Sequence, residues 1–233
     1  MSEEDPKQIV TSGYDQCARA YLAARVRDSS PELMLLAAKL RRPARILDIG
    51  CGAGLPVTAA LSGMGSVVGI DISSTQIDLA RGNVPSAQFI HGDVMVQDFL
   101  EASFDAVVVF YALFHLPRAE QAELISRVMR WTVPGGYLLA TLPRKDHPGY
   151  TENDFFGVTM YWSHYETSWY RGRLEDVGFR ILHLGELGHG YRDVPGLRPE
   201  RHPIVFAQRL PNVADRRGPR YAQVHAAERQ TLG

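Results

Sequence analysis

The sequence predicts an α/β protein with an open, mostly parallel sheet and helices on both faces. Short β-branched runs alternate with segments of helical period along most of the 233 residues, and this alternation is typical of parallel strands joined by helical crossovers. The strand expected at residues 105–111 is apolar without a break from Ala106 onward, as expected of a strand buried on both faces, so we place it at the centre. No helix separates the last two strands, 179–184 and 204–208, which predicts that they pair antiparallel at the edge.

The elements follow in chain order. We expect seven strands, at residues 45–50, 67–71, 88–91, 105–111, 137–142, 179–184 and 204–208. The first ends in glycine, the second ends in an acidic residue and the third runs into Gly92-Asp93, while the fifth follows the turn sequence at 134–136. Helices are expected at about 12–27, 30–40, 56–63, 74–82, 118–131 and 165–177. The helix at 118–131 is the clearest, because its apolar residues share one face.

Composition excludes several classes of protein. With 45% hydrophobic and 22% charged residues the chain is an ordinary folded domain. A net charge of −1 makes a nucleic-acid partner unlikely. The acidic N-terminus lacks an export signal, and the longest apolar run is far shorter than the ~20 residues that span a bilayer, so we expect a cytoplasmic protein without membrane contact. Two unclustered cysteines suggest neither a disulfide framework nor a metal site.

Glycines and acidic residues gather where consecutive strands end. The first strand runs into Gly50, Gly52 and Gly54, the second ends at Asp71, and the third is followed by Asp93. Strand ends meet at one edge of a parallel sheet, where ligands bind. Glycines allow close approach of a ligand to the backbone, Asp71 can accept both hydroxyls of a ribose, and Asp93 can accept from an adenine amine. The alternative is that these residues form plain turns and helix caps.

These segments together resemble the small-molecule branch of the class I S-adenosylmethionine-dependent methyltransferases. The resemblance spans about residues 12–210 and rests on Ile46–Gly54, Val68–Ser73, His91–Val94 and Pro134–Gly136. It implies a Rossmann-like seven-stranded sheet with an antiparallel last strand, and S-adenosylmethionine as cofactor. The cofactor-binding residues that it implies are Gly50, Gly52 and Gly54 under the methionine, Asp71 at the ribose, Asp93 and Val94 at the adenine, the Phe110 backbone beside the sulfonium, and Ile72.

The pattern Gly13-Tyr14-Asp15…Tyr21…Arg25 resembles the lid helix of the same branch. The resemblance implies that Tyr14 and Arg25 contact the cofactor and that Tyr21 faces the substrate. The alternative is that these aromatic residues only dock an N-terminal helix.

A dinucleotide-binding enzyme is the main competitor. Its G-x-G-x-x-G fingerprint requires glycine at position 55 or 57, but Leu55 and Val57 stand there. Hydride transfer is therefore disfavoured.

Motifs and residues that the sequence lacks exclude several types of methyltransferase. The segment 110–113 lacks the Asn/Asp-Pro-Pro-aromatic motif of enzymes that methylate amino groups of DNA and of protein glutamine, and neither Cys17 nor Cys51 is placed as a nucleophile for cytosine. Lys145 is the only lysine beyond position 39, which excludes the ribose-methylating tetrad with two lysines. We therefore expect a small, aromatic or heterocyclic metabolite as acceptor.

The acceptor pocket is expected from the segment after the fifth strand. Residues 150–170 contain 8 aromatic side chains, and from them we select Tyr161, Trp162 and Tyr165 as substrate-binding. About half of these aromatics, Trp169 among them, are expected to pack the following helix on the sheet.

His115 and His164 are the candidate catalytic residues. Each could act as a base for a hydroxyl acceptor or contact the acceptor, whereas a thiol or amine may need no base. For His115 the alternative is a capping hydrogen bond.

One methyltransferase domain is expected at residues 1–210. It would carry lid helices at about 1–42 and an aromatic acceptor-site insertion at about 143–165, followed by a basic, flexible tail at 211–233. We expect a monomer or homodimer without a metal. Residues 192–233 hold 8 basic and 4 acidic residues, so a methyltransferase that docks RNA or protein through this region is one alternative. A catalytically silent S-adenosylmethionine-binding subunit is another.

Overall fold

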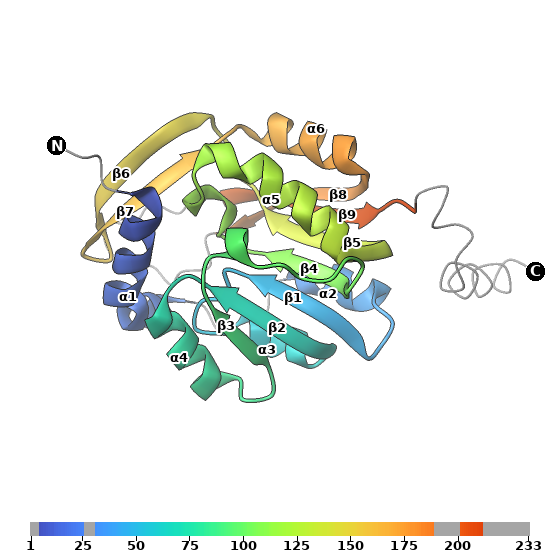
Figure 1. The fold of residues 1–233 in the computed structure, drawn as a ribbon, viewed down its shortest axis with the longest axis horizontal. Helices are drawn as coiled ribbons and strands as arrows, with labels where there is room; N and C mark the ends of the chain where they lie inside the picture. The colour runs from blue at the N-terminus through green and yellow to red at the C-terminus, as the bar shows by residue number, and fades with distance from the viewer. Residues whose placement is uncertain (1–4, 26–30, 189–200, 212–233) are drawn as a thin grey trace, which may run out of the picture.

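The computed structural model describes residues 5–25, 31–188 and 201–211 (Figure 1). Its main sheet has the strand order β3-β2-β1-β4-β5-β9-β8. Strands β1 to β5 pair parallel, whereas β9 pairs antiparallel with both β5 and β8. This confirms the predicted seven-stranded sheet with an antiparallel last strand. The strands are β1 (Ala44–Ile49), β2 (Gly65–Asp71), β3 (Gln88–His91), β4 (Phe104–Val109), β5 (Thr132–Thr141), β8 (Phe179–Gly188) and β9 (Arg201–Arg209).

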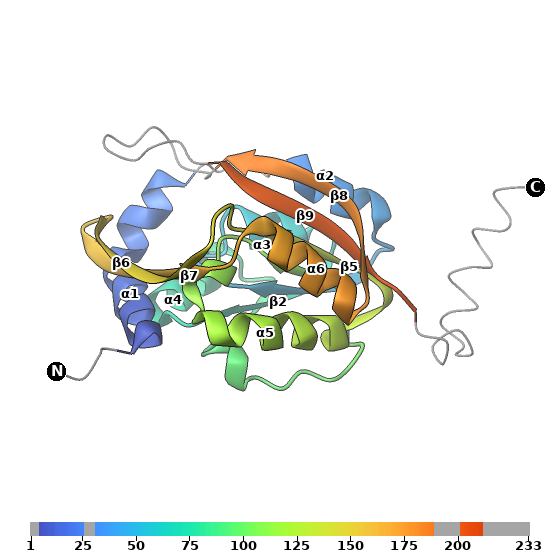
Figure 2. The ribbon, with the colours of Figure 1, turned by 90° about the horizontal axis from the view of Figure 1, so that it is seen from above.

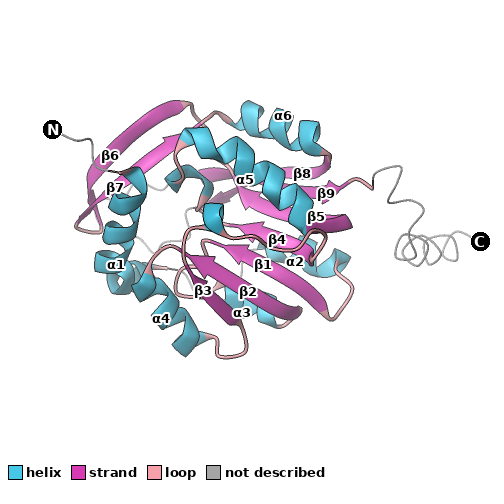
Figure 3. Cartoon of the chain, in the orientation of Figure 1, coloured by secondary structure: helices cyan, strands magenta, loops and turns pink. Residues whose placement is uncertain are grey.

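Helices cover both faces of this sheet (Figures 2 and 3). Helices α5 and α6 pack with the sheet in one apolar cluster, and α2 and α3 pack in another. The helices are α1 (Pro6–Ala24), α2 (Pro31–Lys39), α3 (Val57–Ser62), α4 (Ser74–Asn83), α5 (Arg118–Trp131) and α6 (Thr167–Val177), with single 3-10 turns at η1 (Val94–Val96) and η2 (Leu113–His115). No helix in the described ranges is both long and apolar enough to cross a membrane.

Strand β4 lies in the middle of the sheet, as its unbroken apolar run predicts. Val107 packs in the cluster under α5 and α6, while Ala106 and Val108 pack in the cluster under α2 and α3. All three side chains are fully buried. Burial on both faces leaves no position for a polar side chain from Ala106 to Val109, after Asp105 at the start of the strand.

A second, two-stranded sheet covers the edge of the molecule beside α1 (Figure 1). It consists of β6 (His147–Phe155) and β7 (Val158–His164), which pair antiparallel. Phe155 and Met160 are buried against Val10 and Cys17 of α1. The sequence predicts an aromatic insertion here but no strands, because the exposed face of β6 carries acidic residues that mask the alternation.

Several element boundaries differ from the predicted ones: β8 runs to Gly188 instead of 184, β9 begins at Arg201 instead of 204, and the starts of α1 and β5 differ most clearly. Helix α1 begins at Pro6 instead of residue 12, because Asp5 caps it by accepting from the Lys7 amide and proline suits the first helical turn. Strand β5 begins at Thr132, with the Pro134–Gly136 sequence inside the strand at a shift of register. The predicted basic tail lies outside the described residues apart from Pro211.

Gly65 and Gly172 form a matched pair for testing the packing of the sheet. A Cβ added to Gly65 would lie 1.9 Å from the carbonyl oxygen of Ala44 on the neighbouring strand, whereas nothing lies within 4 Å of one added to Gly172 in α6. We expect Gly65→Ala to lower the free energy of unfolding by about 2 kcal/mol, because β1 and β2 must separate. Gly172→Ala should raise it by about 0.5–1 kcal/mol through helix propensity. Urea unfolding of both variants measures these changes, and equal effects would contradict this account of the β1–β2 contact.

Candidate functional site

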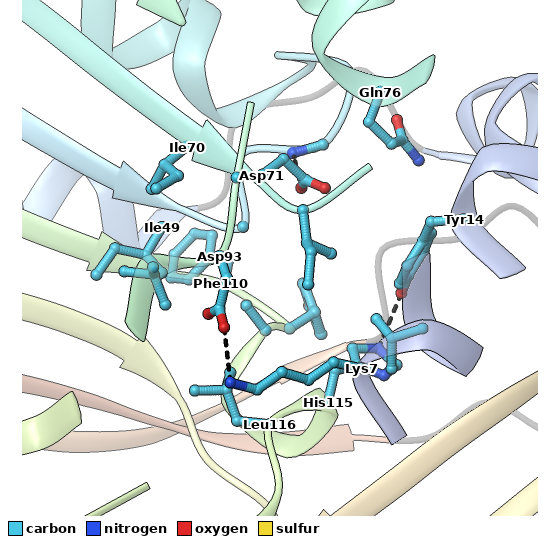
Figure 4. A pocket seen from close by; sticks show the side chains of 18 of the residues that line it. Lys7, Tyr14, Ile49, Ile70, Asp71, Gln76, Asp93, Phe110, His115 and Leu116 are labelled. Carbon is cyan, nitrogen blue, oxygen red and sulfur yellow. Dashed lines mark hydrogen bonds and ion pairs between the residues drawn. The ribbon is translucent and has the colours of Figure 1, made fainter. Parts of the chain in front are cut away.

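A pocket of about 760 Å³ opens at the carboxyl ends of β1, β2 and β4, under helix α1 (Figure 4). Its walls come from segments far apart in the chain, which the parallel sheet brings to one edge. The predicted site residues that line it are Tyr14, Tyr21, Gly50, Gly52, Asp71, Ile72, Asp93, Val94, Phe110 and His115. Most of the residues predicted for the cofactor therefore share one cavity with His115 and Tyr21.

The glycine loop forms the floor of this pocket at the end of β1. Gly50 and Gly52 have φ angles of +69° and +53°, in the left-handed region that favours glycine. A Cβ added to Gly50 would lie 2.4 Å from the Cβ of Ala112, so the loop and the segment after β4 touch at this point. Gly54 faces α4 instead, where an added Cβ would meet Val84.

Asp71 joins the glycine loop to the end of β2. Its Oδ2 accepts the backbone N–H of Gly52 at 2.9 Å, and its Oδ1 accepts that of Ser73 at 2.9 Å. Burial raises the pKa of Asp71, although these two hydrogen bonds oppose the shift. Each carboxylate oxygen keeps a further lone pair. The side chain can therefore accept two more hydrogen bonds from a diol in the pocket.

Asp93 has two roles at the end of β3. Its Oδ1 accepts from the Met95 amide and caps η1, while its Oδ2 lies 2.6 Å from the ammonium of Lys7. Lys7 also pairs with Glu120 at 2.6 Å. Burial lowers the pKa of Lys7, but its hydrogen bonds to the two carboxylates outweigh this effect and raise it overall. Asp93 therefore both caps η1 and lines the pocket, two roles that the sequence leaves as alternatives.

Helix α1 is held over the pocket at a second point by Asp15. Its Oδ1 accepts from the Ser73 hydroxyl at 2.6 Å and from the Thr75 amide at 3.0 Å. Burial raises the pKa of Asp15, but these hydrogen bonds more than compensate and lower it. The carboxylate thus sits at the N-terminus of α4, where a negative charge is favourable.

His115 lies between α1 and the β6–β7 hairpin. Its Nδ1 is 3.0 Å from the carbonyl oxygen of Tyr161, and its Nε2 is 2.9 Å from the hydroxyl of Tyr14. Because a carbonyl can only accept, Nδ1 carries the proton and Nε2 accepts from Tyr14. Burial lowers the pKa of His115 to about 4. The ring is therefore neutral at physiological pH, and it packs against Trp162 with ring centroids 4.3 Å apart.

Five predicted site residues, besides Gly54, do not line this pocket. The Tyr161 carbonyl accepts a hydrogen bond from His115, and the Trp162 ring packs against the His115 ring. Tyr165 stacks on Trp169 with ring centroids 3.8 Å apart, and both side chains are half-buried against the apolar cluster under α5 and α6. The ring of His164 forms a hydrogen bond with the Lys145 carbonyl. Arg25 lines an adjoining cavity of about 420 Å³, and its guanidinium lies 5.0 Å from the centre of the Tyr111 ring.

Sequence reasoning missed several residues that the fold brings to these cavities. Lys7, Gln76 and Tyr111 line the main pocket. Asp48 lines the adjoining cavity, where burial raises its pKa to about 7 despite a hydrogen bond from Thr58. Among these residues only Asp48 could have been singled out from the sequence, because it is an acidic residue inside an otherwise apolar strand. The positions of Lys7 and Gln76 follow only from how α1 and α4 pack.

The buried neutral His115 predicts a pH dependence of stability. The unfolded chain binds a proton at this residue near pH 6.5, whereas the folded protein resists protonation until about pH 4. The contribution of the neutral His115 ring to the free energy of unfolding is complete above pH 6.5. This contribution falls by about 3 kcal/mol as the pH is lowered to 4. Urea unfolding at pH 7, 5.5 and 4 should therefore show a shallower pH dependence for His115→Asn than for the wild type. Parallel curves would contradict the assignment of a neutral ring.

Comparison with known proteins places this pocket in a family. Residues 46–136, from β1 into β5, match a family model described as a methyltransferase domain. The chain is 33% identical over 121 residues to the 24-methylenesterol C-methyltransferase 2 of Oryza sativa subsp. japonica, covering 46% of this chain and 33% of that protein. It is also 33% identical over 139 residues to the dTDP-3-amino-3,6-dideoxy-alpha-D-glucopyranose N,N-dimethyltransferase of Streptomyces fradiae, covering 56% and 49%. The chain thus spans between a third and a half of the length of these curated relatives.

A solved structure shows the same fold. The SAM-dependent methyltransferase from Methanosarcina mazei superposes with a TM-score of 0.66 at 24% identity, covering 78% of this chain and 99% of that one. The matched family region contains the glycine loop, Asp71 and Asp93, and the sheet has the predicted order with an antiparallel last strand. Residues 46–136 are thus similar to the methyltransferase domain family, the sheet has the fold of the class I S-adenosylmethionine-dependent methyltransferases, and S-adenosylmethionine is the methyl donor.

Proposed function

We propose that this chain transfers a methyl group from S-adenosylmethionine to an O, N or S atom of a small, aromatic or heterocyclic metabolite. The observation that carries the proposal is the single pocket that joins the glycine loop and Asp71 to an aromatic wall holding the Tyr14–His115 pair. A cofactor site and an acceptor site must adjoin for direct transfer.

The pocket residues fit the cofactor. Gly50 and Gly52 leave a floor without side chains, and Asp71 presents two oxygens that can accept from the ribose hydroxyls. Asp93 and Val94 line the same cavity at the end of β3, where we place the adenine. Arg25, in the adjoining cavity beside the glycine loop, is placed to pair with the methionine carboxylate.

Methyl transfer places few chemical demands on the protein. The bound cofactor supplies an electrophilic methyl group, so the chain mainly aligns the acceptor and excludes water. His115 is a weak base because burial lowers its pKa to about 4 and its free nitrogen already accepts from Tyr14. We infer that His115 positions the Tyr14 hydroxyl, and that the Tyr14 oxygen accepts a hydrogen bond from the acceptor. An amine or thiol that needs no strong base suits this arrangement.

The acceptor class is proposed from the pocket walls. Tyr14, Tyr21, Phe110 and Tyr111 surround the cavity next to His115, which suits a flat, mostly apolar molecule with a few polar groups. The relatives named for a sterol and for a nucleotide-linked amino sugar support small molecules as the substrate class.

Calorimetry with S-adenosylhomocysteine tests the cofactor site. We expect the wild type to bind and Asp71→Asn to bind tenfold or more weakly, because hydrogen bonds to a charged group contribute about 1.5–3 kcal/mol. Asp78→Asn, on the exposed part of α4, is the matched control and should bind like the wild type. No binding to the wild type, or equal binding to Asp71→Asn, would refute the assignment.

An untargeted assay tests the acceptor class. The protein is incubated with S-adenosylmethionine and a metabolite extract of its source organism, and mass spectrometry identifies compounds that gain one methylene unit. With that acceptor, we expect Tyr14→Phe to lower kcat about tenfold while the affinity for S-adenosylhomocysteine changes little, because the lost hydroxyl contacts the acceptor. Methylation confined to RNA or protein would overturn the small-molecule proposal.

A further inference from the structure

Tyr111 turns the chain out of the sheet at the pocket edge, in a backbone conformation that side chains rarely adopt. It lies two residues beyond Val109, where β4 ends, and its φ angle is +57°. The left-handed region is unfavourable for a bulky residue, so the surrounding structure must hold this turn. Phe110, Tyr111 and Ala112 all line the main pocket. Strained residues gather at functional sites, and this one lies at the edge of the proposed site.

The Thr141 hydroxyl holds the turn by a hydrogen bond. Strands β4 and β5 pair in parallel as far as Val109 and Ala140 (Figure 1), and Thr141 is the next and last residue of β5. Its Oγ1 accepts the backbone N–H of Tyr111 at 2.6 Å, and both residues are buried. A side-chain oxygen here takes the place of a main-chain carbonyl. The chain can therefore leave the sheet without burying an unpaired N–H.

The other contacts of Tyr111 hold its ring and not its peptide. The hydroxyl donates to the carbonyl of Gly188 at the end of β8. The ring centre lies 5.0 Å from the guanidinium of Arg25. Removing the Thr141 hydroxyl would thus free the backbone of the turn while the far end of the Tyr111 side chain stays anchored.

Thr141 can influence the site only through this turn. It is fully buried and lines neither the main pocket nor the adjoining cavity. Ala112, which follows Tyr111, caps η2 and accepts the backbone N–H of His115 at 3.1 Å. His115 accepts in turn from the Tyr14 hydroxyl, which the proposed function places against the acceptor. The Thr141 hydroxyl is therefore connected to the acceptor side through one turn and one short helix.

We propose that Thr141 is a positioning residue for methyl transfer, whose hydroxyl fixes the turn at residues 110–112 between cofactor and acceptor. This inference rests on the proposed function. An in-line displacement requires the methyl group and the acceptor atom to be held in one geometry. The turn touches the cofactor floor where Ala112 meets Gly50, and it leads to His115 on the acceptor side. The proposed ribose contact, Asp71, has hydrogen bonds that do not involve the turn. Loss of the Thr141 hydroxyl should therefore lower the rate more than the cofactor affinity.

Kinetics of Thr141→Val, which nearly keeps the shape of the side chain but removes the hydroxyl, test this role. The formation of S-adenosylhomocysteine is followed with S-adenosylmethionine and serial dilutions of the metabolite extract, whose limiting rate and half-saturating dilution stand for kcat and KM. We expect kcat to fall about tenfold, because the reacting groups lose their alignment. The calorimetric affinity for S-adenosylhomocysteine should stay within about twofold of the wild type. Thr141→Ser, whose hydroxyl can accept the same N–H, should restore most of the rate.

Thr132→Val is the matched control on the same strand. Thr132 is the first residue of β5, is as fully buried as Thr141, and donates its hydroxyl to the carbonyl of Val128 at 2.7 Å. It lies at the opposite end of β5 from the turn. Thr132→Val should lower the stability in urea unfolding, as Thr141→Val does, and yet keep the wild-type rate.

The outcomes separate this inference from the function on which it rests. If the wild type forms no S-adenosylhomocysteine at any dilution of the extract, the proposed function fails. If the wild type is active and Thr141→Val keeps its rate, the positioning role is overturned. It is also overturned if the affinity for S-adenosylhomocysteine falls by the same factor as the rate, or if Thr141→Ser does not restore the rate. Thr141→Ala, with the same expectations, replaces the valine variant if thermal melting shows that variant to be unfolded.

Discussion

The carboxylate of Asp71 is the point on which the pocket depends. It accepts one backbone N–H from the glycine loop after β1 and one from the start of α4 after β2. Two loops from neighbouring parallel strands are thereby fixed to one side chain. This fixed geometry leaves the remaining lone pairs of Asp71 and the amide of Gln76 aimed at the same cavity. Without the carboxylate, the floor and the α4 wall would lose the side chain that joins them.

Helix α1 is attached to this framework by polar contacts spread along its length. Lys7 pairs with Asp93 and Glu120, Asp15 caps α4, and the Tyr14 hydroxyl bonds His115. All of these contacts except the Lys7–Glu120 pair join the helix to a segment that also lines the pocket. The helix therefore does not merely cover the cavity but contributes charge and hydrogen bonds to its walls.

Much of the framework could be predicted from the sequence, because the responsible signals are local. The apolar run of β4 marks the central strand, and glycines and aspartates at strand ends mark the pocket edge. Residues such as Lys7 and Gln76 escaped prediction because their role depends on the packing of two helices. The many aromatic residues at 150–170 likewise do not indicate which side chains point into the pocket and which pack elsewhere. Tyr165 turns to Trp169 and His164 to a backbone carbonyl, while Trp162 supports His115 from outside the pocket.

The β6–β7 hairpin has a consequence for how this protein could diverge. Through the Tyr161 carbonyl it sets which nitrogen of His115 carries the proton, and through Phe155 and Met160 it carries part of α1. Both the hairpin and α1 lie outside residues 46–136, the part that matches the family model. The proposed acceptor side thus involves two pieces that contact each other and lie outside the matched region, whereas the strand ends proposed to hold the cofactor lie inside it. On this proposal, a substitution on α1 that changes the pocket calls for a matching substitution in the hairpin, because the two pieces share one apolar cluster.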